Sequence, residues 1–417
     1  MNPTMSARLP DHGIAWDELR REMKDAGRGD ADWRGGRVPM FIHYAGEDVL
    51  DVAKQAYLMY FSENGLGPRA FGSLDKFEKD VVAMGLDLLH GGPEARGAMT
   101  TGGTESIFLA VKCARDRALA LRPGAGRPRI VMPRSAHPAF DKAAHFLGLE
   151  PVRTPLGEDF RADLDAMRAA LTSDTAMLVG SAPAFPHGVV DPIPQLAAMA
   201  REHGTWMHVD ACVGGYFAPF ARELGADIPD FDFAVPGVTS ISADLHKYGY
   251  TAKGASTLFF ADPASFALMG YAFDQWPRGQ YFTHTLVGTR AGGAIAAAWA
   301  VMNYLGKDGY LRIARRVLDT RLAMQAGLDA LGLPTLGRPE LSIFAFGSPQ
   351  RDMGAIGRGL GARGWTVGYV NDPPGIHHML NLTHEPVVGQ YLSDMAAVLQ
   401  DPATQAGPSA SPVPAQY

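Results

Sequence analysis

Five short apolar runs recur through the middle of the chain, each followed by a segment in which apolar residues return at helical spacing. The runs cover residues 129–132, 176–180, 206–210, 239–242 and 257–260. Runs of this length are typical of strands that are buried on both faces, and helices between them indicate parallel connections. The pattern therefore predicts an α/β fold whose large domain is built on a mostly parallel sheet.

The segments that flank these runs predict the division of the chain. Helical spacing is found on both sides of residues 64–68, where Asn-Gly-Leu-Gly-Pro predicts a loop. The nearly all-apolar stretch 293–305 predicts a buried helix, and 341–346 and 378–382 predict strands of a later domain. We expect an N-terminal arm without regular structure (1–50), a large domain (51–308), a small C-terminal α/β domain (309–400) and a disordered tail rich in Pro, Ala and Ser (401–417).

Composition and charge narrow the function. The 417 residues are 47% hydrophobic, which suffices for a large packed core, and the net charge of -6 offers no bulk attraction for nucleic acid. The chain has only two cysteines and no CxxC or HExxH pattern. This argues against a disulfide framework and against a zinc site. The sequence has no leader-like start and no uninterrupted apolar stretch of about 18 residues. We expect a cytoplasmic protein without an integral membrane segment.

The strongest local signal surrounds Lys247, in the run Ser-Ile-Ser-Ala-Asp-Leu-His-Lys-Tyr-Gly-Tyr at 240–250. The pattern predicts a strand that delivers His246 and Lys247 into a turn. Burial lowers the pKa of a lysine, and a neutral amine can form a Schiff base with an aldehyde. We therefore expect a depressed pKa for Lys247, although an isolated His-Lys pair more often belongs to a solvated turn.

A second element is the start of a predicted helix at Gly102, Gly103 and Thr104. Glycines permit close backbone approach, and the free amides of a helix N-terminus bind phosphate under the positive end of the helix dipole. Alone, Gly-Gly-Thr is also an ordinary helix cap.

Two further residues end predicted strands. Asp210 follows a strand at 206–209, where a carboxylate can bond a protonated pyridine nitrogen, and His137 follows the strand at 129–132, where an imidazole can stack on a cofactor ring. In isolation Asp210 could equally cap a turn, and His137 would more often be structural. We call residues 102–104 the phosphate cup. Taken in order, the phosphate cup, a histidine, an acid and a lysine predict a site for pyridoxal 5'-phosphate (PLP), bound as a Schiff base on Lys247.

With these residues in place, the chain resembles the fold-type-I PLP enzymes, within them the amino-acid decarboxylases and sphingosine 1-phosphate lyases, and among these most closely the lyases. The discriminating residue is Lys253, six positions after Lys247, which is similar to a lyase feature that typical decarboxylases lack. The resemblance extends from about residue 44 to about residue 399. It includes the stretches 101–106, 181–188, 208–215, 242–254 and 373–377.

The resemblance implies roles for particular residues. Gly102, Gly103, Thr104 and His246 would bind the cofactor with His137, Asp210 and Lys247, while Gly288 and Thr289 would reach the phosphate from a neighbouring subunit. A homodimer with shared active sites follows. Tyr44 and Lys253 would face the phosphate or the reacting hydroxyl of the substrate, although without the resemblance packing and solvation are the preferred interpretations of the two residues.

One segment departs from the lyases. Where they carry a Leu-His-Pro-Asp type of loop, this chain has Gly67 in place of the histidine and Arg69 in place of the acid, and Pro-Arg at 68–69 is similar to decarboxylases. With His187 of the lyase-like stretch 181–188, Gly67 and Arg69 are our candidates for substrate contacts.

We expect retro-aldol cleavage of a phosphorylated amino alcohol of the sphingoid base type, giving an aldehyde and phosphoethanolamine. The alternative is a PLP-dependent L-amino-acid decarboxylase, for which Arg69 could bind an acid. A third interpretation, a non-catalytic relative, would be favoured if Lys247 or Asp210 were missing, and both are present.

Overall fold

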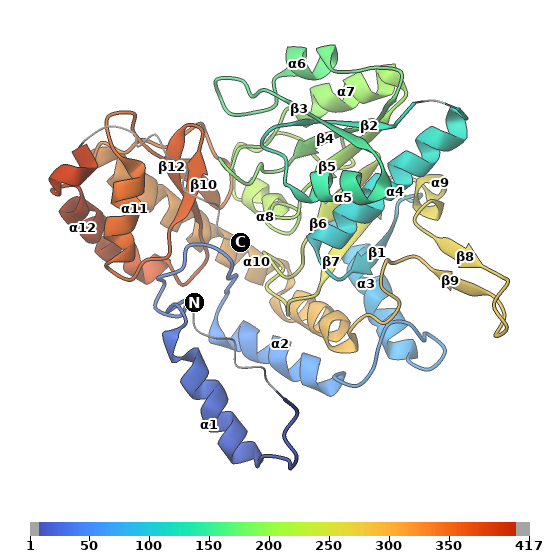
Figure 1. Cartoon of the computed structure of the whole chain (residues 1–417), viewed down its shortest axis with the longest axis horizontal. Helices are drawn as coiled ribbons and strands as arrows, with labels where there is room; N and C mark the ends of the chain where they lie inside the picture. Colours follow the sequence, from blue (N-terminus) through green and yellow to red (C-terminus); the bar gives the residue numbers. More distant parts are fainter. Residues whose placement is uncertain (1–7, 125, 406–417) are drawn as a thin grey trace.

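The computed structural model describes residues 8–124 and 126–405, and its centre is a seven-stranded sheet of order β1-β7-β6-β5-β4-β2-β3 (Figure 1). The strands are β1 (Arg96–Thr100), β2 (Arg129–Pro133), β3 (Glu150–Thr154), β4 (Thr175–Ser181), β5 (Trp206–Asp210), β6 (Ser240–Ala243) and β7 (Ser256–Phe260). Strands β3, β2, β4, β5 and β6 pair in parallel, whereas β7 is antiparallel to both β6 and β1. The prediction of a mostly parallel sheet is confirmed.

Strands β1 and β3 were not predicted. β1 has the sequence Arg-Gly-Ala-Met-Thr, in which two apolar residues are too few to form a run, and β3 is an edge strand that is exposed over most of its length. An edge strand pairs with a neighbour on one side only and is partly exposed to solvent. It therefore lacks the apolar run that is typical of a central strand.

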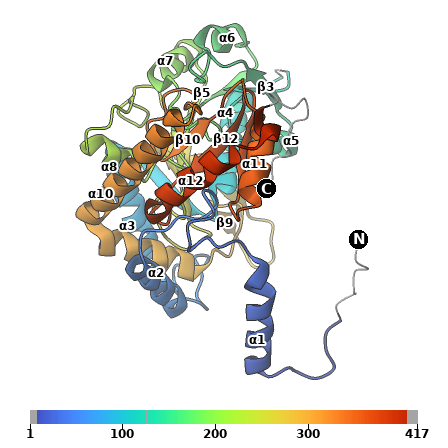
Figure 2. The ribbon, with the colours of Figure 1, turned by 90° about the vertical axis from the view of Figure 1, so that its left-hand side faces the viewer.

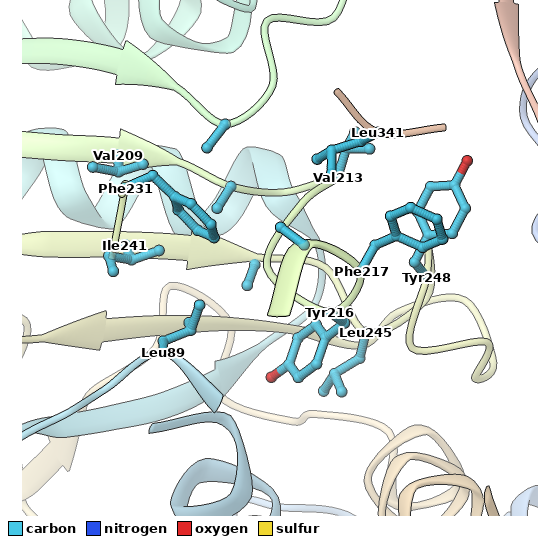
Figure 3. Packing of buried hydrophobic residues seen from close by; sticks show 14 of the residues in the cluster. Leu89, Val209, Val213, Tyr216, Phe217, Phe231, Ile241, Leu245, Tyr248 and Leu341 are labelled. Atoms are coloured by element: carbon cyan, nitrogen blue, oxygen red, sulfur yellow. The ribbon is translucent and has the colours of Figure 1, made fainter. Parts of the chain in front are cut away.

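Both faces of the sheet are covered, which explains the continuous apolar runs. On β4, Leu178 joins one core cluster and Val179 the other, and on β7 the same holds for Phe259 and Phe260. Successive residues of a strand point to opposite faces, so a strand buried on both sides is apolar at every position. Figure 3 shows Phe231 packed across Val209 and Ile241 on one of these faces.

In the large domain two helices precede the sheet, and most of the others connect successive strands. The helices are α2 (Glu47–Met59), α3 (Gly72–Leu88), α4 (Gly103–Leu121), α5 (Ala139–Leu147), α6 (Leu164–Ala169), α7 (Ile193–His203), α8 (Ala218–Glu223) and α9 (Pro263–Ala267), with a small hairpin of β8 (Tyr271–Phe273) and β9 (Tyr281–Thr283). The predicted loop at 64–68 lies between α2 and α3. In the described part of the chain, no helix combines the length and apolarity needed to cross a bilayer.

The long helix α10 (Gly292–Ala330) joins the large domain to a C-terminal unit. Its backbone breaks at Gly306, whose φ of 53° only glycine adopts readily, two residues before the expected end of the large domain. The C-terminal unit contains the antiparallel sheet β10-β12-β11, with β10 (Ile343–Phe346), β11 (Gly368–Asn371) and β12 (Pro374–Met379), and the helices α11 (Met353–Gly361), η2 (Glu385–Val387) and α12 (Val388–Val398).

The strand expected at 378–382 begins earlier, because β12 starts at Pro374 and ends at Met379. Pairing with the residues beside β10 continues for one position, where Leu380 donates to the carbonyl of Ser342, and Leu382 then donates to the carbonyl of Tyr44 in the N-terminal arm. The apolar residues of this stretch are therefore buried by contacts outside the strand.

The N-terminal segment has more structure than expected. Helix α1 (Trp16–Ala26) has no buried residue, continues into η1 (Gly27–Gly29) and projects from the body of the molecule (Figures 1 and 2). Residues 37–44 lie along the C-terminal unit, where Thr366 donates to the carbonyl of Arg37 and Met379 to that of Pro39. This part packs on another surface, as expected of an arm.

The tail was predicted to be disordered, and for residues 401–405 this is wrong. They include the short helix η3 (Pro402–Gln405), in which Thr404 is buried and accepts a hydrogen bond from the amide of Asp352. The side chain of Asp352 also caps α11, so the start of the tail is fixed to a helix N-terminus. Residues 406–417 lie outside the described residues.

Candidate active site

A cavity of about 390 Å³ lies at the carboxyl ends of β4, β5 and β6, beside the N-terminus of α4. This is the edge at which parallel α/β sheets bind ligands. The predicted cofactor residues that line the cavity are Gly102, Gly103, Thr104, His137, Asp210, His246 and Lys247. The structure therefore brings together residues that are as far apart in the sequence as positions 102 and 247.

The phosphate cup is formed by the first turn of α4. Its N-cap is Gly102, and no side chain caps the helix, so the first amides are available to a ligand. A Cβ at Gly103 would lie 2.7 Å from Asp244 Oδ2 and 2.8 Å from Cys212 Sγ. Only glycine fits at this position, and the close backbone approach that it permits fits a phosphate group.

Asp210 is the last residue of β5 and is nearly buried. Its Oδ1 accepts hydrogen bonds from the amide of Cys212 (3.1 Å) and from Ser242 Oγ (3.4 Å). Behind it lies His208, whose pKa burial lowers to about 4 and whose ring nitrogens contact Ser240 and Ser242. A neutral histidine and two hydroxyls thus hold the acid at the strand end.

Lys247 lies at the end of a tight turn that follows β6. Its amide donates to the carbonyl of Asp244, and its Nζ lies 3.0 Å from Asp244 Oδ2. Burial by itself lowers the pKa of Lys247, but the carboxylates of Asp244 and Asp210 act in the opposite direction and prevail, so the pKa of Lys247 is raised. The expected depression of this pKa is therefore wrong, because the expectation left out the carboxylate of Asp244.

Two histidines complete the walls. His137 lies between β2 and α5 and accepts a hydrogen bond at Nδ1 from the amide of Ala139, while His246 Nδ1 donates to the carbonyl of Ala255 at 2.7 Å. Burial lowers the pKa of both rings. At neutral pH both imidazoles are therefore uncharged, which leaves Lys247 as the cation among the residues that line the cavity.

Tyr44 and Lys253 do not line this cavity. They line a neighbouring cavity of about 430 Å³, where Tyr44 donates to Glu47 and Lys253 Nζ donates to the carbonyl of His246 (3.2 Å). Burial, and secondly the charge of Lys247, lower the pKa of Lys253. Lys253 thus lies in the neighbouring cavity and bonds the backbone of His246, which lines the cofactor cavity.

The other candidates also lie elsewhere. The loops that carry Gly67 and Gly288 adjoin each other, since Gly65 donates to the carbonyl of Arg290 at 2.9 Å, and Arg69 and Thr289 are exposed. His187 is buried with its ring stacked on Phe160 at 4.4 Å. The structure does not bring these residues to the cofactor cavity of the same subunit.

Glu105 is a buried residue that sequence reasoning missed. One carboxylate oxygen accepts from the amide of Thr101 (2.7 Å), and the other accepts from the amide of Leu286 (2.9 Å). Glu105 therefore connects the phosphate cup to the loop of Gly288 and Thr289. An acid in the first turn of a helix was the only available signal, and it is common at helix N-termini.

The cup, the strand-end acid and the lysine fit PLP, and fold and cavity together define a fold-type-I PLP-dependent enzyme. Residues 76–332 match the pyridoxal-dependent decarboxylase conserved domain. The chain is 38% identical over 409 residues to a sphingosine-1-phosphate lyase of Arabidopsis thaliana, covering 96% of this chain and 75% of the relative. The chain belongs to the sphingosine-1-phosphate lyase family.

Two further comparisons are with a lyase and with a decarboxylase. The structure of a Burkholderia pseudomallei sphingosine-1-phosphate lyase matches with a TM-score of 0.90 at 36% identity, over 94% of this chain and 92% of that one. A probable L-tyrosine/L-aspartate decarboxylase of Methanothermobacter thermautotrophicus is 34% identical over 329 residues, which cover 79% of this chain and 88% of the relative. Lyases and decarboxylases thus share this architecture.

Proposed function

We propose that this enzyme cleaves a phosphorylated long-chain amino alcohol by a retro-aldol reaction, yielding a fatty aldehyde and phosphoethanolamine. The observation that carries the proposal is the similarity to sphingosine-1-phosphate lyases, which covers 96% of this chain for the Arabidopsis thaliana protein and 94% for the Burkholderia pseudomallei structure. When bound, PLP supplies a cationic ring that accepts the electron pair of the breaking carbon-carbon bond.

The chain's own residues have distinct tasks in this proposal. The first turn of α4 binds the cofactor phosphate, and the carboxylate of Asp210 holds a proton on the pyridine nitrogen. Lys247 would hold the cofactor through its amine and would be released when the substrate amine binds. His137, in the cavity wall, would lie against the ring and keep water from that face.

A place for the hydrocarbon chain supports the proposal. A cavity of about 540 Å³ adjoins the cofactor cavity, with which it shares His137 and Phe185. Met40, Tyr369 and Val370 contribute to its mostly apolar wall. An apolar space next to the reacting centre suits a long alkyl chain, because burial of each methylene contributes about 0.8 kcal/mol.

Tyr44 and Lys253 keep the role that the family resemblance implies, as contacts of the substrate phosphate or of its reacting hydroxyl. Lys253 donates to the carbonyl of His246, and Tyr44 lines the same neighbouring cavity as Lys253, which supports a place for both at the edge of the site. We keep as proposed substrate contacts Gly67, Arg69 and His187. Because Arg69 is exposed, it could contact a substrate only in a site completed by a second subunit.

We further propose a homodimer with shared active sites. Large apolar side chains are exposed around the loops of Gly67 and Gly288; they are Leu58, Met59, Phe61, Leu66, Phe282, Leu286 and Val287. Apolar side chains gathered in this way mark an interface, and a second copy covers them by symmetry. This arrangement gives Gly288 and Thr289 a route to the phosphate of the neighbouring subunit.

The alternative, decarboxylation of an L-amino acid, uses the same cavity and is favoured by the similarity to the Methanothermobacter thermautotrophicus protein. Purified holoenzyme is therefore assayed with long-chain base phosphates and with a panel of amino acids that includes L-tyrosine and L-aspartate. We expect aldehyde from the base phosphates alone. Carbon dioxide from an amino acid, without aldehyde from any base phosphate, would establish the alternative.

A further inference from the structure

Asp244 is a buried carboxylate in the cofactor cavity to which no role has been assigned. Its side chain is 2% exposed, and the only charged group within 3.5 Å among the described residues is Lys247, at 3.0 Å. Its second oxygen, Oδ1, is buried and has no hydrogen-bond partner in the described part of the chain. The hydroxyl of Ser256 also lies close to this carboxylate. A buried anion with an unbonded oxygen is costly, so its position beside the cofactor lysine points to a function.

We propose that Asp244 is the counter-ion of Lys247, which keeps this side chain an ammonium whenever it is not bonded to the cofactor. The turn from Asp244 to Lys247 fixes the pair, because the amide of Lys247 donates to the carbonyl of Asp244 and the amide of Asp244 donates to the carbonyl of Cys212. The carboxylate lies against the first turn of α4, where a Cβ added at Gly103 would be 2.7 Å from Asp244 Oδ2.

The other titratable groups around Asp244 leave this pairing intact. They are His246 with Nε2 at 3.8 Å, Cys212, Asp210, His137, Tyr216 and Lys253. Burial keeps both histidines neutral and the thiol of Cys212 protonated, since it lowers the pKa of the rings and raises that of the thiol. Lys253 bonds backbone carbonyls. Lys247 is thus the cation that Asp244 pairs with.

The ion pair of Asp244 and Lys247 determines which group gives and which group takes a proton during the cleavage. This assignment rests on the proposed function. A substrate ammonium that displaces Lys247 leaves Lys247 protonated, so charge and protons balance. Beside an anionic Asp244 this ammonium is a poor base for the substrate hydroxyl, which must lose its proton to another group. Lys247 is instead the acid that protonates the carbon bearing the amine, after which the neutral amine can rebind the cofactor.

The test needs no substrate. Full-length protein from which cofactor has been removed is mixed with pyridoxal, which lacks the phosphate, and the rate of Schiff-base formation is followed by absorbance from pH 6 to 11. Only the neutral amine reacts, so below its pKa the rate rises about tenfold per pH unit. In wild type we expect the rise to continue past the ordinary lysine pKa of ~10.4. A plateau reached near pH 8 would overturn the proposal without any variant.

Asp244→Asn removes the charge and keeps the size of the side chain. We expect its rate profile to move to lower pH, with Schiff-base formation at least tenfold faster than wild type at pH 8. The matched control is Asp116→Asn, because Asp116 on α4 pairs with Lys112 at a similar 3.1 Å but lies outside the cavity. An Asp244→Asn profile that coincides with wild type would overturn the proposal. The same rate profiles are also measured with PLP. A shift of the Asp244→Asn profile with PLP but not with pyridoxal would likewise overturn the proposal, since Asp244 would then act on the cofactor phosphate.

Discussion

The connection made by Glu105 leads to a quantitative prediction. Its Oε2 accepts the amide of Thr101 in the phosphate cup, and its Oε1 accepts the amide of Leu286 and, at 3.4 Å, that of Val287 in the loop of Gly288. Glu105→Gln replaces one oxygen by an NH₂ group, which cannot accept. One buried amide then loses its partner, at a cost of about 2–3 kcal/mol for a bond to a charged acceptor.

Because about 1.4 kcal/mol corresponds to a tenfold change in an equilibrium constant, we expect Glu105→Gln to weaken PLP binding by about 30- to 150-fold. Titration of full-length protein with PLP, followed by absorbance, measures this constant, and thermal unfolding should show a lowered Tm. The control is Glu150→Gln, since Glu150 lies exposed on β3. PLP affinity within twofold of wild type at an unchanged Tm would refute the coupling of cup and loop.

Three further predictions concern the substrate and the subunits. Lys253→Met should raise KM for the phosphorylated substrate by about tenfold or more through loss of a charged hydrogen bond, with unchanged cofactor absorbance; unchanged KM and kcat would exclude the role. Val367→Trp narrows the apolar cavity and should raise KM for long-chain but not short-chain base phosphates, whereas equal effects on both would argue against chain binding there. Lys247→Ala and Gly288→Asp should each be inactive, yet their mixture should recover about a quarter of wild-type activity if subunits exchange and share sites; no recovery despite demonstrated exchange would contradict sharing.

The sequence predicted best where a pattern follows directly from local geometry. The runs that became β2, β4 and β7 are largely apolar because both faces of the sheet are covered, whereas β5 and β6 mix buried polar residues with apolar ones. The cavity residues were predictable as a set, since each lies near a strand end or a helix start at the ligand-binding edge, although each residue alone has an ordinary structural interpretation. Their order along the chain then indicated that they belong to one cofactor site.

What could not be predicted depends on contacts between distant segments. The carboxylate of Asp244 acts through a turn that brings it to Lys247, and its effect on the pKa of Lys247 outweighs burial. Glu105 matters only because the loop near residue 286 returns to α4. Residues 401–405 have a composition typical of disorder but are held by the N-terminus of α11. Composition and spacing do not contain such contacts.

The central claim is that the bond beside the amine-bearing carbon breaks to give an aldehyde. The most direct measurement is mass spectrometry of the products formed by holoenzyme from a long-chain base phosphate in D₂O, with Lys247→Ala as the blank. We predict equal amounts of fatty aldehyde and phosphoethanolamine, the latter with one deuterium on the carbon that bears the amine. Intact base phosphate, together with carbon dioxide release from an amino acid by the same preparation, would contradict the account.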